Sequence, residues 1–273
     1  MKFKTAVLMV ALLAAPIVRC HAVQPCVVTT TSVLSSLVAQ IGAGAVRTVT
    51  LLPSGCCPAQ FDLSVADVRE LEKSGVLFAH GYEPYLAGLK KTVRNPAFTV
   101  YLFPEDGNWQ VPDIQASMAG RVAERLSLLY PGDAARFSEQ RAVLERRLHG
   151  QSRTLRKSVV AAGLKGRPVI CDNFLKDILV FLGLDVVAVY GRPEDLSAVR
   201  MSVFLREGKK AGVRLVVDNL QAGPDTGKEF AREFGAVHVV FSNFPGGFPG
   251  TTTLEDTLRE NVRRLLSAYG KHL

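Results

Sequence analysis

The sequence lacks the patterns that mark most enzymes. No phosphate-binding glycine loop, His-Glu-x-x-His pattern or nucleophile triad is found in its 273 residues, so we expect neither catalysis nor a catalytic cofactor. Beyond residue 22, every apolar run is shorter than the roughly 20 residues that cross a membrane. The formal net charge is +8, but Lys and Arg are spread along helical segments without interleaved aromatic residues. This distribution does not favour a nucleic-acid partner.

What the N-terminus does contain is an export signature. A positively charged start, an apolar run over residues 6–18 and the small residue Ala22 match the three parts of a secretory signal peptide. Residues 1–22 are therefore predicted to be removed after Ala22, which places the mature chain in the periplasm or another extracytoplasmic compartment. Cys20 is an alternative site for lipid attachment, although Arg19 is larger than the residue that lipoprotein processing favours before the cysteine.

Short runs rich in β-branched residues alternate with helical segments, which is typical of βα units built on parallel sheets. We expect an α/β fold with two such lobes, over residues 23–131 and 164–273. Residues 132–163 lack an internal proline and are predicted to form one long helix that joins the lobes. We expect the protein to be a monomer. The eight expected strands are 27–31, 46–52, 76–79, 98–102, 168–171, 186–190, 214–218 and 237–241.

Polar and sulfur-bearing side chains follow several of these strands. The carboxyl ends of the strands of an open α/β sheet form its ligand crevice, so these side chains predict a ligand cleft between the two lobes. They are Cys56 and Cys57 in the first lobe with His80, and Cys171, Asp172, Asp218, Asn219, Ser242 and Asn243 in the second.

This arrangement resembles the metal-binding solute receptors of ABC importers, in particular the zinc and manganese type. The resemblance implies a receptor that captures a transition metal ion outside the cytoplasm and delivers it to a membrane permease driven by an ATPase. The segments that carry the resemblance are Val27–Leu34, Leu52–Gly55 with Val65–Val68, Phe78–Leu86, Trp109–Ala116 and Val216–Gln221.

The chain departs from this family at the metal ligands, which are usually three histidines and one carboxylate. All three histidines are missing, so a three-histidine site is excluded. The residues that stand at or near the four ligand positions are Ala59, Gly107, Asp172 or Cys171, and Ser242 or Asn243.

Sulfur is the predicted replacement. Cys57 and Cys171 are our candidates for the primary metal ligands, one from each lobe, because thiolates bind zinc in tetrahedral sites and select soft ions. Zinc is the expected cargo, with copper(I) or nickel as alternatives, whereas manganese prefers oxygen and nitrogen ligands. The supporting candidates are Cys56, Asp172, Asp218 and His80.

Several alternatives stay open at the level of sequence. The cysteines of an exported chain can form disulfides, for example between Cys26 and Cys56. The cargo can be a metal chelate or a small organic molecule, and a thiol-disulfide redox protein is a further hypothesis. Asp218 can cap the helix that follows Gly223, and His80 can be a packing residue. The glycine- and proline-rich segment 242–250 is predicted to be a lid over the ligand.

Overall fold

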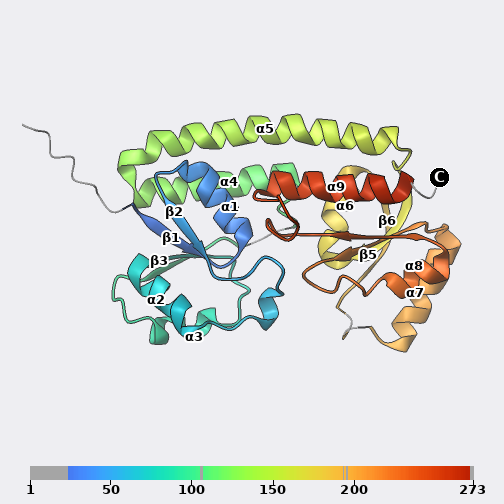
Figure 1. Cartoon of the computed structure of the whole chain (residues 1–273), viewed down its shortest axis with the longest axis horizontal. Helices are drawn as coiled ribbons and strands as arrows, with labels where there is room; N and C mark the ends of the chain where they lie inside the picture. The colour runs from blue at the N-terminus through green and yellow to red at the C-terminus, as the bar shows by residue number, and fades with distance from the viewer. Residues whose placement is uncertain (1–23, 105–106, 193, 195, 271–273) are drawn as a thin grey trace, which may run out of the picture.

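A computed structural model describes residues 24–104, 107–192, 194 and 196–270. The predicted signal peptide and Cys20 lie outside these residues. Two four-stranded parallel sheets lie side by side beneath a layer of long helices, as Figure 1 shows. The predicted α/β fold with two βα lobes and one long connecting helix is confirmed. Within the described ranges, no helix has the length and apolar content needed to span a membrane.

The N-terminal sheet has the strand order β2-β1-β3-β4. Its strands are β1 (Cys26–Thr29), β2 (Arg47–Thr50), β3 (Val76–Ala79) and β4 (Thr99–Leu102). One face packs against α1 (Ser32–Gly42) and α4 (Pro112–Leu129), and the other against α2 (Val65–Ser74) and α3 (Leu86–Thr92). Helices on both faces explain why the central strand β3, Val-Leu-Phe-Ala, is continuously apolar rather than alternating.

The C-terminal sheet repeats this plan with the order β6-β5-β7-β8. Its strands are β5 (Pro168–Asp172), β6 (Asp185–Tyr190), β7 (Leu215–Asn219) and β8 (Val237–Phe241). The helices that cover it are α6 (Lys176–Leu182) and α9 (Leu254–Gly270) on one face and α7 (Ala198–Ala211) and α8 (Lys228–Phe234) on the other. All eight strands that the sequence predicts are present, with ends that coincide or differ by one or two residues.

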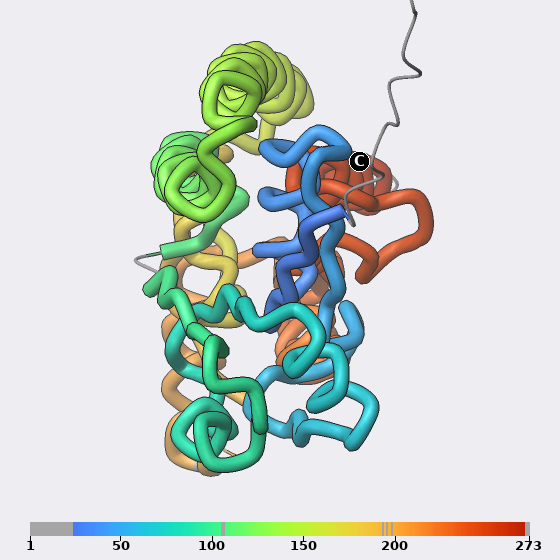
Figure 2. Tube along the Cα trace, turned by 90° about the vertical axis from the view of Figure 1, so that its left-hand side faces the viewer, coloured from blue at the N-terminus to red at the C-terminus, as the bar shows by residue number. Residues whose placement is uncertain are grey.

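The long helix α5 (Ala134–Ala161) has 28 residues, which is about 42 Å at 1.5 Å per residue. Its buried side chains divide between the two lobes. Phe137 and Leu144 belong to the N-terminal core, whereas Leu155 and Val159 belong to the C-terminal core. Figure 2 shows α5 nearly end-on above α4, which packs along it. One rigid element therefore contributes to both cores and fixes their separation.

A buried carboxylate joins the helices above the sheets. Glu255, in the first turn of α9, accepts hydrogen bonds from Gln40 of α1 and Gln115 of α4, both at 3.2 Å. Arg147 of α5 forms an ion pair with the same carboxylate at 3.2 Å, and Gln151 donates to the Glu255 carbonyl. Four helices thus meet at one polar point inside the helical layer, and this point ties the two lobes together.

Side chains cap the starts of two helices. Ser64 and Asp67 form a capping box at the start of α2. Thr253 and Asp256 exchange hydrogen bonds in the same way at the start of α9. Asp133 precedes α5, but its side chain makes no capping hydrogen bond there.

Candidate ligand-binding cavity between the lobes

A cavity of about 560 Å³ lies between the lobes, at the carboxyl ends of the parallel strands. Both halves of the chain contribute to its wall. Lining residues from the N-terminal half include Val33, Cys57, Ala59, His80, Tyr82 and Trp109. Those from the C-terminal half include Phe174, Asp177, Arg192, Asn219, Gln221 and Asn243. A cavity large enough for a small organic molecule therefore lies where the sequence predicts the ligand cleft.

The loop after β3 contributes an aromatic part of the cavity wall. His80 is buried, and its Nε2 lies 2.8 Å from the Thr31 hydroxyl. Its ring stacks on Tyr82 and meets Trp109 edge-on, with ring centroids 5.1 Å and 4.9 Å away. Burial lowers the pKa of His80 to about 4, against the opposing effect of the nearby Glu83 carboxylate. The imidazole is thus neutral at pH 7.

Glu83 does not face the ligand. It is buried, and its two carboxylate oxygens accept the backbone N–H groups of His80 at 3.0 Å and Gly81 at 2.7 Å. These bonds fold the chain back just after β3, where Gly81 has a φ of 109° that favours glycine. The turn positions the His80 ring in the cavity wall.

Carboxamides bridge the two lobes across the base of the cavity. The Asn108 side chain donates to the Phe174 carbonyl and to Asn243 Oδ1, both at 2.8 Å. Gln110 donates to the Ser242 carbonyl at 2.8 Å and to the same Asn243 oxygen at 3.2 Å. These residues lie more than 60 positions apart in the sequence, so only the packing of the lobes brings them together.

A second bridge joins the loop after β2 to the loop after β7. Gln221 donates from Nε2 to the Ser54 carbonyl at 2.8 Å and to the Ser242 hydroxyl at 2.9 Å. Its side-chain oxygen accepts the Asn243 backbone N–H at 3.0 Å. Asn219 in turn accepts the Gln221 backbone N–H, which orders this loop. The cysteine loop is therefore held against the second lobe through its neighbour Ser54.

The two cysteines that we expected to bind metal together lie in different environments. Cys57 lines the cavity and is partly buried, whereas its neighbour Cys56 is exposed and is not among the lining residues. Cys171 is fully buried within the core of the C-terminal lobe, among Val169, Leu175 and other apolar residues. The expectation that Cys171 supplies a ligand to the cleft is wrong, because its side chain points from β5 into the core beneath α6 and α9 and not into the cavity.

Burial also raises the pKa of the Cys171 thiol well above its usual range, with a smaller contribution from the Asp172 carboxylate. Cys171 is therefore a protonated core residue. All four cysteines in the described part of the chain are free thiols, so the disulfide alternative, including Cys26 with Cys56, is not what the structure contains.

Asp218 is also turned away from the cavity, contrary to our expectation. Its carboxylate is fully buried and accepts hydrogen bonds from the Tyr190 hydroxyl at 2.5 Å and from His238 Nε2 at 2.6 Å. The backbone N–H of Gly227, just before α8, donates to both oxygens at 3.0 Å and 2.9 Å. The structure agrees instead with the alternative interpretation, in which the Asp218 carboxylate caps the start of the helix that follows Gly223.

Asp172 ends β5 close to the cavity but is not among the residues that line it. It accepts the Phe174 backbone N–H at 2.9 Å and an Asn219 side-chain N–H at 3.4 Å. Burial raises the pKa of Asp172 to about 6, and these two hydrogen bonds oppose that effect. Of the six predicted ligands, Cys57 and His80 line the cavity. No group of three or more His, Cys, Asp or Glu side chains among the described residues could hold a metal ion.

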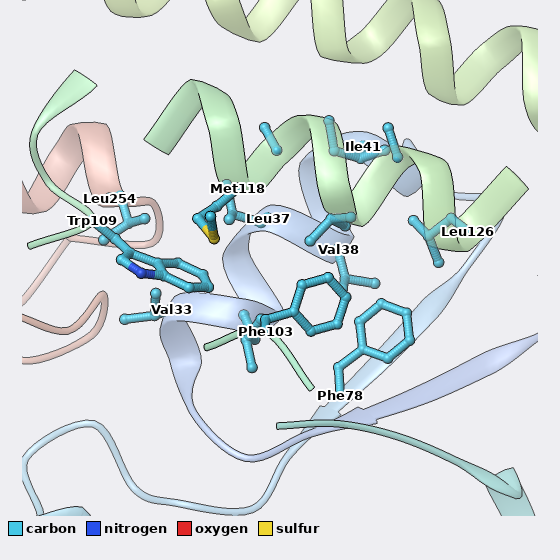
Figure 3. Packing of buried hydrophobic residues seen from close by; sticks show 14 of the residues in the cluster. Val33, Leu37, Val38, Ile41, Phe78, Phe103, Trp109, Met118, Leu126 and Leu254 are labelled. Atoms are coloured by element: carbon cyan, nitrogen blue, oxygen red, sulfur yellow. The ribbon is translucent and has the colours of Figure 1, made fainter. Parts of the chain in front are cut away.

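The predicted lid is an anchor instead. Phe244 is buried in the core of the N-terminal lobe, although it comes from the C-terminal half of the chain. The Arg264 guanidinium lies 3.6 Å from the centre of the buried Phe248 ring. Figure 3 shows this core, with Trp109 at one edge beside Val33 and Met118. Segment 242–250 therefore helps hold the lobes together, although Phe244 also lines the cavity.

Sequence reasoning missed several residues of the wall, namely Asn108, Asn173, Phe174 and Asp177. Each follows a strand within eight residues, so a wider window after every strand end would have included them. Their types gave no signal, because amides and a phenylalanine in loops are common.

Comparison with protein families matches residues 27–268 to the family described as ZnuA, zinc-uptake complex component A periplasmic. This match spans most of the chain. Comparison with curated proteins gives no significant match.

Among solved structures, the fold is similar to a cadmium-bound periplasmic metal binding protein from Candidatus Liberibacter asiaticus. The TM-score is 0.75 at 14% identity, over 90% of this chain and 99% of that one. A crystal structure of ZnuA gives a TM-score of 0.74 at 15% identity, with the same coverage. At these identities the likeness concerns the fold.

Proposed function

Since the chain belongs to the family of ZnuA, the periplasmic component A of a zinc-uptake complex, we propose that its interlobe cavity captures a transition metal for an ABC importer. The family consists of transport receptors, not enzymes. The protein would bind its cargo outside the cytoplasm and present it to the permease in the membrane.

The cavity itself is the observation that carries this proposal. It lies where two parallel sheets direct their carboxyl ends towards each other, and both halves of the chain line it. Cargo held there would contact both lobes, so a change in their spacing would change its affinity. Because α5 and the carboxamide bridges fix that spacing, release requires these bridges to open.

Zinc is the proposed metal, with copper(I) or nickel as alternatives. Structures similar in fold are described as binding cadmium or manganese, and the family is named for zinc uptake. The cavity wall contains one thiol, Cys57, and one imidazole, His80. Both donor types suit zinc and copper(I) better than manganese. Cys57 is our candidate for direct contact with the metal.

We also propose how the chain is divided into segments. Residues 1–22 would be a signal peptide removed after Ala22, residues 23–131 and 164–273 would form the lobes, and residues 132–163 would form the linker. We propose that the receptor acts as a monomer, because one copy contains both walls of the cavity.

Metal content measured after purification without chelators tests the proposal. The wild-type protein is expected to carry about one transition metal ion per chain, identified by elemental analysis. Cys57→Ser should lose most of this metal, whereas Cys56→Ser serves as the matched control because the neighbouring thiol does not line the cavity. A wild-type protein free of transition metal, even when produced in zinc-supplemented medium, would contradict the proposed cargo.

A further inference from the structure

The cavity presents hydrogen-bond donors where a site for a bare cation needs lone pairs. Trp109 lines the cavity and is only 2% exposed, yet its buried indole Nε1–H has no hydrogen-bond partner among the described residues. A buried donor without an acceptor costs free energy, so such groups usually have a partner in the functional state. The indole cannot ligate a metal, because its nitrogen is a donor only.

Asn243 adds a second donor. Its side-chain oxygen accepts hydrogen bonds from both Asn108 and Gln110, which fixes the orientation of the carboxamide. The amide nitrogen, Nδ2, makes none of the hydrogen bonds found among the described residues, and Asn243 lines the cavity. The carboxamide of Asn173, also in the wall, is likewise not used within the described residues. These amide groups can donate to an acceptor that enters the cavity.

The charges in the wall point in the same direction. Arg192 brings a guanidinium to the cavity, where it also pairs with Glu194 at 3.5 Å. Asp177 is the carboxylate in the described wall, and one of its oxygens already accepts the Asn108 backbone N–H at 3.1 Å. No group of three or more His, Cys, Asp or Glu side chains in the described part of the chain could surround a bare cation, so the histidine-rich site usual for the family is not reproduced.

We infer that the cavity takes its metal as a complex with a small carboxylate-bearing organic chelator, and not as a bare ion. Carboxylate oxygens of the chelator would accept from Trp109, Asn243 and Arg192, and its carbon atoms would pack against Tyr82 and Phe174. The volume of about 560 Å³ suits a molecule of this size, whereas a single ion fills a small part of it. Cys57 would complete the coordination of the chelated metal. This inference rests on the proposed function.

Trp109 is the sole tryptophan of the chain, so intrinsic fluorescence reports directly on the cavity. The purified protein is titrated with zinc chloride, with zinc complexes of citrate, histidine and nitrilotriacetate, and with each chelator alone. At least one complex is expected to change the Trp109 emission with an affinity tenfold or more above that of zinc chloride and of the matching free chelator.

Two substitutions test the role of the donors. Asn243→Asp keeps the oxygen that bridges the lobes and replaces the unused N–H₂ group with an anionic oxygen. It should weaken binding of the complex by roughly 10- to 100-fold, as expected for a lost hydrogen bond to a charged group, and should strengthen binding of zinc chloride. Asn173→Asp, at an exposed position, should act in the same direction and is expected to fold normally. Gln140→Glu on α5 makes the same amide-to-acid change away from the cavity and should have no effect.

The possible results separate this inference from the proposed function. If zinc chloride binds as tightly as every complex, the chelate is not required and the inference is overturned, while the receptor role stands. If neither zinc chloride nor any complex binds, and copper(I) and nickel give the same result, the metal-receptor function fails as well. If a free chelator binds as tightly as its zinc complex, the metal is not needed for recognition, and the metal cargo fails both in the proposed function and in this inference. Unchanged affinities in both acidic variants would exclude the donors as the recognition groups.

Discussion

Two polar groups that lie at or after strand ends, one in each lobe, differ in how completely their hydrogen bonds are made. The Asp218 carboxylate, in β7, receives donors from Tyr190, His238 and Gly227 and has no exposed surface. The cavity wall, formed by loops that follow strands of both sheets, contains the Trp109 indole, whose buried Nε1–H has no acceptor among the described residues.

The comparison teaches that a polar residue at a strand end is not by itself a ligand-binding residue. A buried carboxylate whose donors are all supplied by the protein stabilises the fold and has no capacity left for cargo. The Asn243 amide nitrogen in the cavity wall, in contrast, makes none of the hydrogen bonds found among the described residues. Three experiments can break or sharpen this distinction.

The largest effect is expected for Asp218→Ala. It takes the acceptor from two buried donors, Tyr190 and Gly227, and from the partly buried His238, so the free energy of unfolding should fall by about 3–5 kcal/mol, measured by urea denaturation. Asp225→Ala, whose exposed carboxylate pairs with Lys228, is the matched control and should change stability by less than about 0.5 kcal/mol. A loss below about 1 kcal/mol in Asp218→Ala would show that the group is not structural.

The next effect is a pH dependence at Asp172, beside the cavity. Its pKa of about 6 in the folded protein is above the ordinary value of 3.8, so the native state binds its proton more tightly than the unfolded state. Its contribution to stability is thus full below about pH 4 and is lost as the pH rises through about 6.

Asp172→Asn removes this titration. Between pH 4 and pH 7, the wild-type protein should lose about 2–3 kcal/mol of unfolding free energy relative to the variant. His80 titrates in both proteins with the opposite sign, because its lowered pKa makes stability rise between about pH 4 and 6.5, so its contribution cancels in the difference. Parallel stability curves for the two metal-free proteins would contradict the raised pKa.

The smallest expected effect on stability distinguishes Cys57 from Cys171, the two cysteines predicted from the sequence to be metal ligands. Cys171→Ser places a hydroxyl in an apolar core and should cost about 1–3 kcal/mol, whereas Cys57→Ser at the cavity wall should stay within about 0.5 kcal/mol. In the native protein, a thiol reagent should modify Cys56 and leave Cys171 unmodified until the chain unfolds. Rapid labelling of native Cys171 would show that it reaches solvent after all.

The local pattern of the chain was enough to predict the strands and the long helix. Each strand is a short β-branched run between turn residues, and α5 follows from a proline-free stretch after Pro131. Strand ends were predicted to line a ligand site, which located Cys57 and His80 in the cavity wall. Those inferences depend on neighbours in sequence, where propensity and turn chemistry act.

The direction of individual side chains could not be predicted in this way. Parallel strands covered by helices on both faces are apolar throughout, so the sequence does not reveal which face a residue takes. In β5, Ile170 packs towards α7 and α8, while Cys171 packs towards α6 and α9. A shift of one position reverses the face, and this is why Cys171 was assigned to the cleft.

The residue pattern was enough to predict the two βα lobes and the long helix that links them. Tertiary structure alone decided that Cys171 and Asp218 belong to the interior, and that amides and Trp109 form the wall. These choices depend on contacts between residues such as Gln110 and Ser242, which are far apart along the chain. Such contacts arise only when the lobes pack, because no local preference specifies a partner more than a hundred residues away.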